Sequence, residues 1–273
     1  MLGGGGLTGI AWLSGVLDEL PPVLGTADRV VGTSAGAVVA ARLLWGGDPS
    51  TLGDLVPQLG DARLRPGAMA RLLAAQVWPS RRHALQWLGR RAVRPVGQVA
   101  RLTARSGSPG PTQAALVDLV GRAIGSDAWP PALIVVAVDA LAGRPAYFTA
   151  RSQVPLASAV AASCAMPDVL PAVRIEGRWF LDGGLRSPAN ADLATGCDRV
   201  LVLAPQWRSA RALRRPEHQA DRLRAHGADV VVLRSANRER QSLSAAALPA
   251  AREAGRRQGR AIAAEVGRLW GEG

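Results

Sequence analysis

The pentapeptide Gly32-Thr33-Ser34-Ala35-Gly36 most constrains how this chain can fold, because it joins a short apolar strand candidate to an apolar helix candidate. Where a chain turns sharply from strand to helix, glycine is needed on both sides, since a Cβ there would crowd the strand and the helix. Such a turn presents Ser34 as a candidate nucleophile and directs the N–H of Ala35 at a developing oxyanion. A buried structural serine in a glycine-rich turn is the alternative interpretation.

Predicted helices and strands alternate along most of the chain. We expect helices at 8–20, 35–45, 114–124, 156–162, 219–226 and 249–270, and strands at 29–33, 132–138, 144–149, 173–181 (a hairpin), 199–204 and 229–233. This order predicts an α/β fold with a mostly parallel central sheet sandwiched by helices. We expect a single domain over residues 1–273, with an arginine-rich helical cap or lid inserted at about 49–111.

The basic residues are all arginine, 33 of them, and give the 273-residue chain a net charge of +12. Such a surface attracts polyanions, but a G+C-rich coding bias explains the composition equally well. Because no nucleic-acid motif accompanies the charge, nucleic acid is not favoured as a partner. In the insertion, leucines and tryptophans alternate with arginines, which fits either an ordinary helical cap or a lid in peripheral contact with an anionic membrane. Of these two interpretations we favour the cap.

We expect neither a targeting signal nor a metal site from this sequence. No apolar run reaches the roughly 18 residues of a membrane span, and the N-terminus does not read as a signal peptide, so we expect a cytoplasmic protein. We interpret Cys164 and Cys197 as reduced, small apolar fillers. Three scattered histidines and unclustered carboxylates offer no ligand set, so we expect neither a metal nor another cofactor.

Two further motifs centre on glycine. In Gly3-Gly4-Gly5-Gly6-Leu7-Thr8-Gly9, consecutive N–H groups can converge on a phosphate or on an oxyanion. The motif contains G-x-G-x-x-G as Gly4, Gly6 and Gly9, but a dinucleotide site needs a full strand before it, so that interpretation is disfavoured. Asp182-Gly183-Gly184 leaves a carboxylate at the end of a strand, where it can accept a proton from a serine or simply cap a turn.

Taken in order, the three motifs resemble the patatin-like phospholipases, acyl hydrolases with a Ser–Asp dyad. The resemblance extends over residues 2–20, 30–41 and 159–204, and includes the segment Ala161-Ala162-Ser163-Cys164-Ala165-Met166-Pro167 and Asn190. It implies a doubly wound α/β fold and an enzyme that cleaves carboxylic esters of lipids, of phospholipase A, lysophospholipase or esterase type. It also implies that Ser34 is the nucleophile and Asp182 the general base, and that the backbone amides of Gly4, Gly5 and Gly6 form the oxyanion hole.

The chain departs from the family pattern at two places. Thr8 stands where arginine or lysine is common, although backbone amides do not need that side chain. Only Met1-Leu2 precedes the glycines, where the family has a strand, so we expect a poorly anchored oxyanion loop unless the chain continues upstream. A catalytically weak scaffold that binds acyl chains or a membrane is therefore one alternative.

A Ser-His-Asp esterase of the α/β-hydrolase type is the other alternative. His218 and His226 follow Asp182 in the order that such a triad requires, whereas His83 precedes it. All three histidines lie among charged residues, which favours an exposed position for each.

Overall fold

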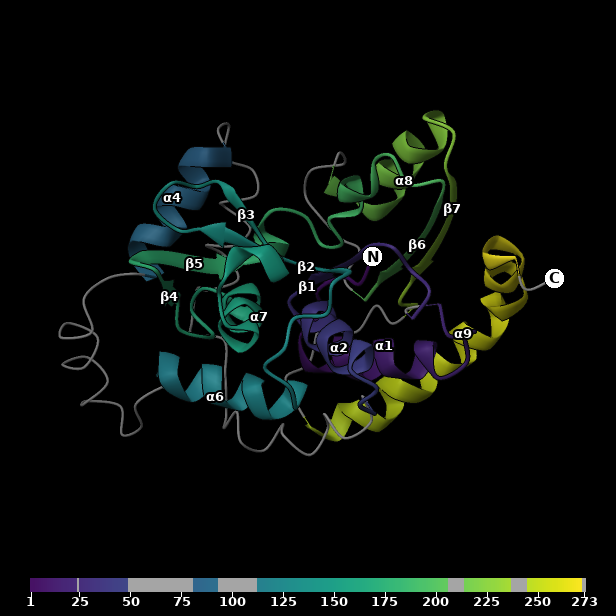
Figure 1. Ribbon diagram of the computed structural model, residues 1–273, viewed down its shortest axis with the longest axis horizontal. Helices are drawn as coiled ribbons and strands as arrows, with labels where there is room; N and C mark the ends of the chain where they lie inside the picture. The colour runs from purple at the N-terminus through teal and green to yellow at the C-terminus, as the bar shows by residue number, and fades with distance from the viewer. Residues whose placement is uncertain (24, 49–80, 93–111, 206–213, 237–244, 272–273) are drawn as a thin grey trace.

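The computed structural model describes residues 1–23, 25–48, 81–92, 112–205, 214–236 and 245–271. Its helices are α1 (Gly6–Leu17), α2 (Ala35–Leu44), α4 (Arg81–Ala92), α6 (Gln113–Ile124), α7 (Leu156–Cys164), α8 (Pro216–Ala225) and α9 (Leu248–Trp270). Its strands are β1 (Val30–Thr33), β2 (Leu133–Asp139), β3 (Pro145–Phe148), β4 (Val173–Ile175), β5 (Arg178–Asp182), β6 (Arg199–Ala204) and β7 (Asp229–Arg234). In Figure 1, helices α6, α2 and α1 lie in the lower part of the view, α9 runs from beneath α1 up the right-hand side, and α4 and α8 lie in the upper part, with α8 beside β7.

The described strands form a mixed sheet. Strands β1, β2, β5 and β4 lie in that order, with β3 also paired to β2, while β6 and β7 form a parallel pair. Strand β1 runs parallel to β2, whereas β3 and β5 run antiparallel to β2. The predicted α/β fold is confirmed. One of the antiparallel pairs is a hairpin, in which a two-residue turn at Glu176 (φ 48°) and Gly177 (φ 79°) folds β5 back on β4, as hairpin turns with two positive φ angles do.

The first three residues take the place of the missing first strand. Leu2 forms parallel bridges with Gly32 on one side and with Leu203 on the other, so this short segment joins β1 to β6. The Leu2 N–H donates to the Val31 carbonyl oxygen at 2.8 Å, and the Leu2 carbonyl oxygen accepts from the Thr33 N–H at 3.0 Å. In Figure 1 the N-terminus lies between β1 and β6. The expectation of a poorly anchored oxyanion loop is therefore wrong.

Apolar side chains fill the space between the helices and the sheet. The largest fully buried ones include Trp12 and Leu13 of α1, Leu133 of β2 and Leu181 of β5. Helix α1 packs along α9 and against α2, so the glycine loop that precedes α1 leads into a firmly packed helix.

Of the predicted insertion at 49–111, only α4 lies within the described residues. Its Leu85 and Leu88 are buried, and a Cβ on Gly89 would lie 1.7 Å from the Ala140 carbonyl oxygen, so this helix packs closely on the turn after β2. These two leucines belong to the protein interior, whereas a lid role for the whole insertion stays a prediction. Among the described helices, none is both long and apolar enough to cross a membrane.

Candidate active site

Ser34 occupies the turn between β1 and α2. It is the first residue after the strand and the N-cap of the helix, with φ 52° and ψ −120°. A positive φ is strained for a residue with a side chain, and such strain is held only where the surrounding structure enforces it. The serine side chain is therefore presented by a sharp, fixed turn, and Ser34 is 9% exposed.

The two glycines beside Ser34 are required by close packing. A Cβ on Gly32 would lie 2.5 Å from the Ala37 Cα, and a Cβ on Gly36 would lie 2.1 Å from the Leu2 carbonyl oxygen. Real Cβ atoms do not approach other atoms this closely, so the predicted crowding of strand and helix is confirmed.

Gly36→Ala tests this crowding, with Gly267→Ala in α9 as the matched helical control. We expect Gly36→Ala to lower the free energy of unfolding by about 1–3 kcal/mol or more, because the new Cβ must displace the Leu2 backbone. No atom lies within 4 Å of a Cβ built on Gly267, so there alanine should stabilise the helix by up to about 1 kcal/mol. Urea unfolding of both variants measures the difference, and equal effects would contradict the close approach at Gly36.

Asp182 ends β5 on the other side of β2 from the serine turn. Thr33 pairs with Val136 of β2, and Asp182 pairs with Ala137, the next residue of β2. A Cβ on Gly183 would lie 2.2 Å from the Val136 carbonyl oxygen, so the D-G-G turn packs directly on the same part of β2. The register of three strands thus brings Ser34 and Asp182 together.

The Asp182 carboxyl group is buried, with 1% of the residue exposed. Burial raises its pKa to about 6, although the Gly184 N–H and the Ser34 hydroxyl oppose that rise. The Gly184 N–H donates to Oδ1 at 2.7 Å, whereas Oδ2 has no hydrogen-bond partner within the described part of the chain. The Ser34 hydroxyl is thus close enough to affect the carboxyl group without a well-formed hydrogen bond to Oδ2. Such hydrogen bonds are often long before substrate binds.

The glycine loop passes beside the serine, because a Cβ on Gly4 would lie 3.4 Å from the Ser34 Cβ. The Gly4 N–H, however, donates to the Pro188 carbonyl oxygen at 2.9 Å, so its predicted place in the oxyanion hole is not supported. Gly5 is the N-cap of α1 and Gly6 its first residue. The first N–H groups of a helix have no partner within the helix, which leaves these two amides available.

The other predicted glycines and Ala35 have local roles. Ala35 is the first residue of α2, so its N–H lies at a helix N-terminus next to Ser34. A Cβ on Gly9 would lie 3.3 Å from the Pro205 Cβ, and one on Gly184 would lie 3.0 Å from the Asp182 Oδ1. These glycines keep the loop and the D-G-G turn tight.

Three residues around the site were not assigned a role in catalysis from the sequence. Asn190 donates through Nδ2 to the Thr33 Oγ1 at 2.9 Å and to the Ser187 carbonyl oxygen at 3.0 Å, which ties the serine turn to the segment after D-G-G. Ser163 accepts a hydrogen bond from the Ser34 N–H at 2.8 Å. Burial and the Asp182 charge raise the pKa of the Cys164 thiol, which stays neutral as expected of a filler but lies beside both Ser34 and Asp182. The sequence signals for this group were the motif A-S-C-A-M-P and Asn190, both noted as part of the family resemblance.

The histidines do not complete a triad. His83 and His226 are exposed, and His226 is occupied by a contact of its Nδ1 with the Arg222 carbonyl oxygen at 2.6 Å. His218 lies in α8, and the groups that shift the Asp182 pKa include no histidine. In the described ranges, no group of three or more His, Cys, Asp or Glu residues could hold a metal ion.

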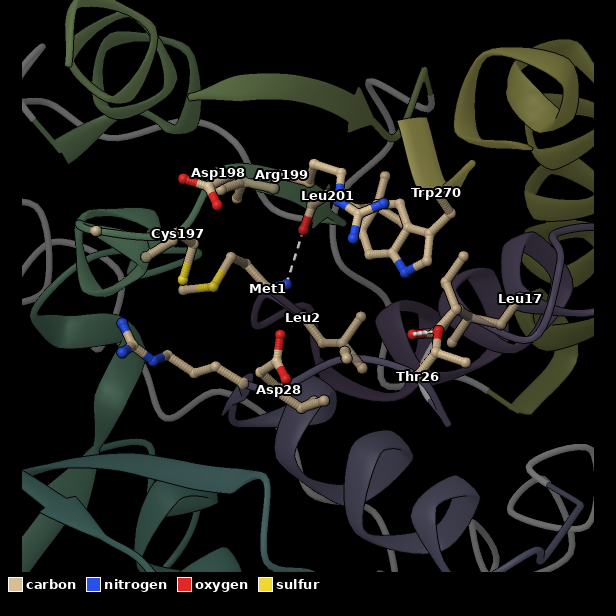
Figure 2. Close-up of a pocket in the computed structure, with 17 residues that line it drawn as sticks. Met1, Leu2, Leu17, Thr26, Asp28, Cys197, Asp198, Arg199, Leu201 and Trp270 are labelled. Carbon is tan, nitrogen blue, oxygen red and sulfur yellow. Dashed lines mark hydrogen bonds between the residues drawn. The ribbon is translucent and has the colours of Figure 1, made fainter. Parts of the chain in front are cut away.

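A cavity of about 310 Å³ lies at the opposite end of the strands (Figure 2). It is lined by Met1, Asp28, Arg29, Arg199 and Trp270 among others, near the amino ends of β1 and β6. Figure 2 shows the Met1 amine donating to the Leu201 carbonyl oxygen, at 2.7 Å. Neither Ser34 nor Asp182 lines this cavity, and ligands of open α/β sheets bind at the carboxyl ends of strands, so the serine turn remains the candidate active site.

The chain is similar to one known protein family and to a solved structure. Residues 1–195 match the family model described as patatin-like phospholipase. The crystal structure of the type III effector protein ExoU is similar to this chain with a TM-score of 0.40 and 19% sequence identity. That similarity covers 98% of this chain and 52% of ExoU, so the chain spans about half the length of that protein. Among the curated proteins compared, none matches the sequence.

Proposed function

Because this chain belongs to the patatin-like phospholipase family, we propose that it is a serine acyl hydrolase that cleaves carboxylic esters of lipids through Ser34 and Asp182. The observation that carries the proposal is the buried Asp182 carboxyl group, whose Oδ2 is unpartnered among the described residues and whose pKa responds to the Ser34 hydroxyl. A serine on a strained turn with a carboxylate base beside it is the arrangement that nucleophilic acyl transfer needs.

In the first half of the reaction, the Ser34 Oγ bonds to the ester carbonyl carbon while its proton passes to the Asp182 Oδ2. The N–H groups of Gly5, Gly6 and Ala35 hold the oxyanion of the tetrahedral intermediate. The bond between the carbonyl carbon and the alcohol oxygen then breaks, and the leaving alcohol takes the proton from Asp182. The products are a free alcohol and an acyl group on Ser34.

In the second half, water replaces the alcohol. Asp182 accepts a proton from the water as its oxygen bonds to the acyl carbon, and the same N–H groups hold the oxyanion. The bond between that carbon and the Ser34 Oγ breaks, and Oγ regains a proton from Asp182. The fatty acid leaves, and the enzyme returns to its starting state without a cofactor.

Neither alternative interpretation has support from an observation in the described residues. The binding-scaffold hypothesis was motivated by a missing first strand and by the basic insertion. Leu2 supplies the connection between β1 and β6, and of the insertion only α4 lies within the described residues. A Ser-His-Asp triad would need a histidine beside Asp182, where the groups that act on the carboxyl are Gly184 and Ser34.

The substrate class is tested by measuring fatty acid release from three lipids in matched vesicles or micelles: phosphatidylcholine, lysophosphatidylcholine and a neutral diacylglycerol. We expect release from at least one of them, and p-nitrophenyl esters of increasing chain length report the acyl preference. Folded protein that releases no fatty acid from any of these esters would contradict the proposed function.

The rate should depend on pH through Asp182. A general base works only when deprotonated, so we expect kcat/KM to rise with pH and to level off above a pKa of about 6. The raised pKa of Asp182 also affects stability, because the folded state holds the proton more tightly than the unfolded state. The contribution of Asp182 to the free energy of unfolding therefore decreases as the pH rises from about 4 to about 6, and it is constant above pH 6. Initial rates from about pH 4 to pH 9 measure the first effect. A rising limb centred near 3.8, the ordinary value of the carboxyl group, would contradict this role.

A further inference from the structure

The Ser163 hydroxyl lies where β1 leaves the sheet. In the parallel pair of β1 and β2, alternate residues of β1 donate their N–H groups to carbonyl oxygens of β2, as Val30 does to Ala132. If this pattern continued past the end of β1, the Ser34 N–H would donate to the Val136 carbonyl oxygen. The Ser163 Oγ bridges these two atoms, accepting from the Ser34 N–H at 2.8 Å and donating to the Val136 carbonyl oxygen at 2.6 Å. One hydroxyl thus pairs both backbone groups at the point where the chain turns away.

The end of α7 also contacts the second member of the pair. The Asp182 N–H donates to the Ala165 carbonyl oxygen at 3.0 Å, two residues after Ser163. Between them, the Cys164 thiol feels the Asp182 charge and the Ser34 hydroxyl. The last turn of α7 therefore contacts the nucleophile candidate through a side chain and the base candidate through its backbone.

We propose that Ser163 is a positioning residue that sets the distance between the Ser34 Oγ and the Asp182 carboxylate. This inference rests on the proposed function, since it concerns the same site. Ser163 is fully buried, so without its hydroxyl the strained Ser34 backbone would lose its partner in a place that bulk water does not reach. The turn would then relax, and a displacement of about 1 Å between reacting groups costs on the order of 100-fold in rate.

Ser163→Ala tests the proposal, and Ser14→Ala is the matched control. Ser14 is also buried in a helix, and its hydroxyl donates to the Ile10 carbonyl oxygen at 2.9 Å, away from the serine turn. We expect Ser163→Ala to lower kcat by about 100-fold with KM changed by less than about twofold, because the substrate site is kept and the reacting groups are misplaced. Ser14→Ala should change kcat by less than about twofold. Ser163→Thr, which restores a hydroxyl, should recover at least about tenfold of the lost rate.

Folding is checked by thermal unfolding of each variant, because a merely structural serine would lower stability without a selective loss of kcat. Folded Ser163→Ala with kcat within about threefold of the wild type would overturn the proposal. If Ser163→Ala does not fold, Ser163→Cys is measured instead, because a thiol of similar size is a weaker hydrogen-bonding group than a hydroxyl. A kcat of Ser163→Cys equal to that of the wild type would then overturn the proposal.

Ser34→Ala and Asp182→Asn, measured in the same assay, separate this inference from the proposed function. If both abolish turnover and Ser163→Ala does not lower it, only the positioning role fails. If Ser34→Ala keeps wild-type turnover, the proposed function fails and the positioning role fails with it.

Discussion

Replacing Ser34 with alanine is expected to lower kcat for ester hydrolysis by about 10⁴-fold or more, because the reaction then has no atom to carry the acyl group. The fold should survive the change. The Ser34 backbone N–H keeps its hydrogen bond to the Ser163 Oγ, and alanine fits the space of a serine at the same backbone angles. Steady-state hydrolysis of a p-nitrophenyl ester and circular dichroism of the same samples measure both effects.

Ser126→Ala is the matched control for this variant. Ser126 follows α6, where its hydroxyl accepts a hydrogen bond from the Ala128 N–H at 3.3 Å, and it takes no part in the site. Its kcat should stay within about twofold of the wild type. A folded Ser34→Ala protein that hydrolyses the ester at the wild-type rate would place the nucleophile elsewhere.

Asp182→Asn is expected to lower kcat by about 10³- to 10⁴-fold, because an amide cannot accept the serine proton. Asparagine keeps the shape of the side chain, and its oxygen can still accept from the Gly184 N–H. Since burial raises the pKa of Asp182, the folded state disfavours its charge, and the neutral amide should leave stability at about pH 8 unchanged or higher. Turnover and thermal unfolding at this pH measure the two effects.

Asp139→Asn is the matched control, because Asp139 is a second buried aspartate with the opposite shift. Burial raises its pKa, but hydrogen bonds from the Ala142 N–H, the Arg178 guanidinium and the Leu141 N–H outweigh that effect and hold the pKa below its usual range. Its charge therefore stabilises the fold, and this stability is lost as pH falls through its lowered pKa. We expect Asp139→Asn to lower stability while the folded protein keeps its turnover. Equal turnover of the two variants would contradict the role of Asp182.

The serine turn and the D-G-G turn could be predicted from the sequence because sharp turns of the backbone require glycine at these positions. Gly32 permits a close contact with Ala37 of the turn's own helix, whereas Gly36 permits the close approach of the Leu2 backbone, and both glycines stand within five consecutive residues. Most helices and strands were also predicted to within a few residues, since each has its own apolar pattern.

Features that depend on contacts between segments far apart in the chain could not be predicted from local sequence patterns. Two residues are too few to show a strand pattern, yet Leu2 pairs on both sides because β1 and β6 leave a gap between them. The Gly4 N–H donates to the carbonyl oxygen of Pro188, a residue far away in the chain. The place of Ser163 depends on the register between β1 and β2, which no local pattern specifies.

Covalent labelling with a fluorophosphonate, followed by intact-mass and peptide mass spectrometry, tests the central claim most directly. In this reaction an activated serine oxygen bonds to phosphorus and fluoride leaves, so the label reports the nucleophile itself. We predict one adduct on the peptide that contains Ser34, no adduct in Ser34→Ala, and markedly slower labelling in Asp182→Asn. Folded wild-type protein that takes up no label, or that carries it on a different residue, would contradict the Ser34–Asp182 mechanism.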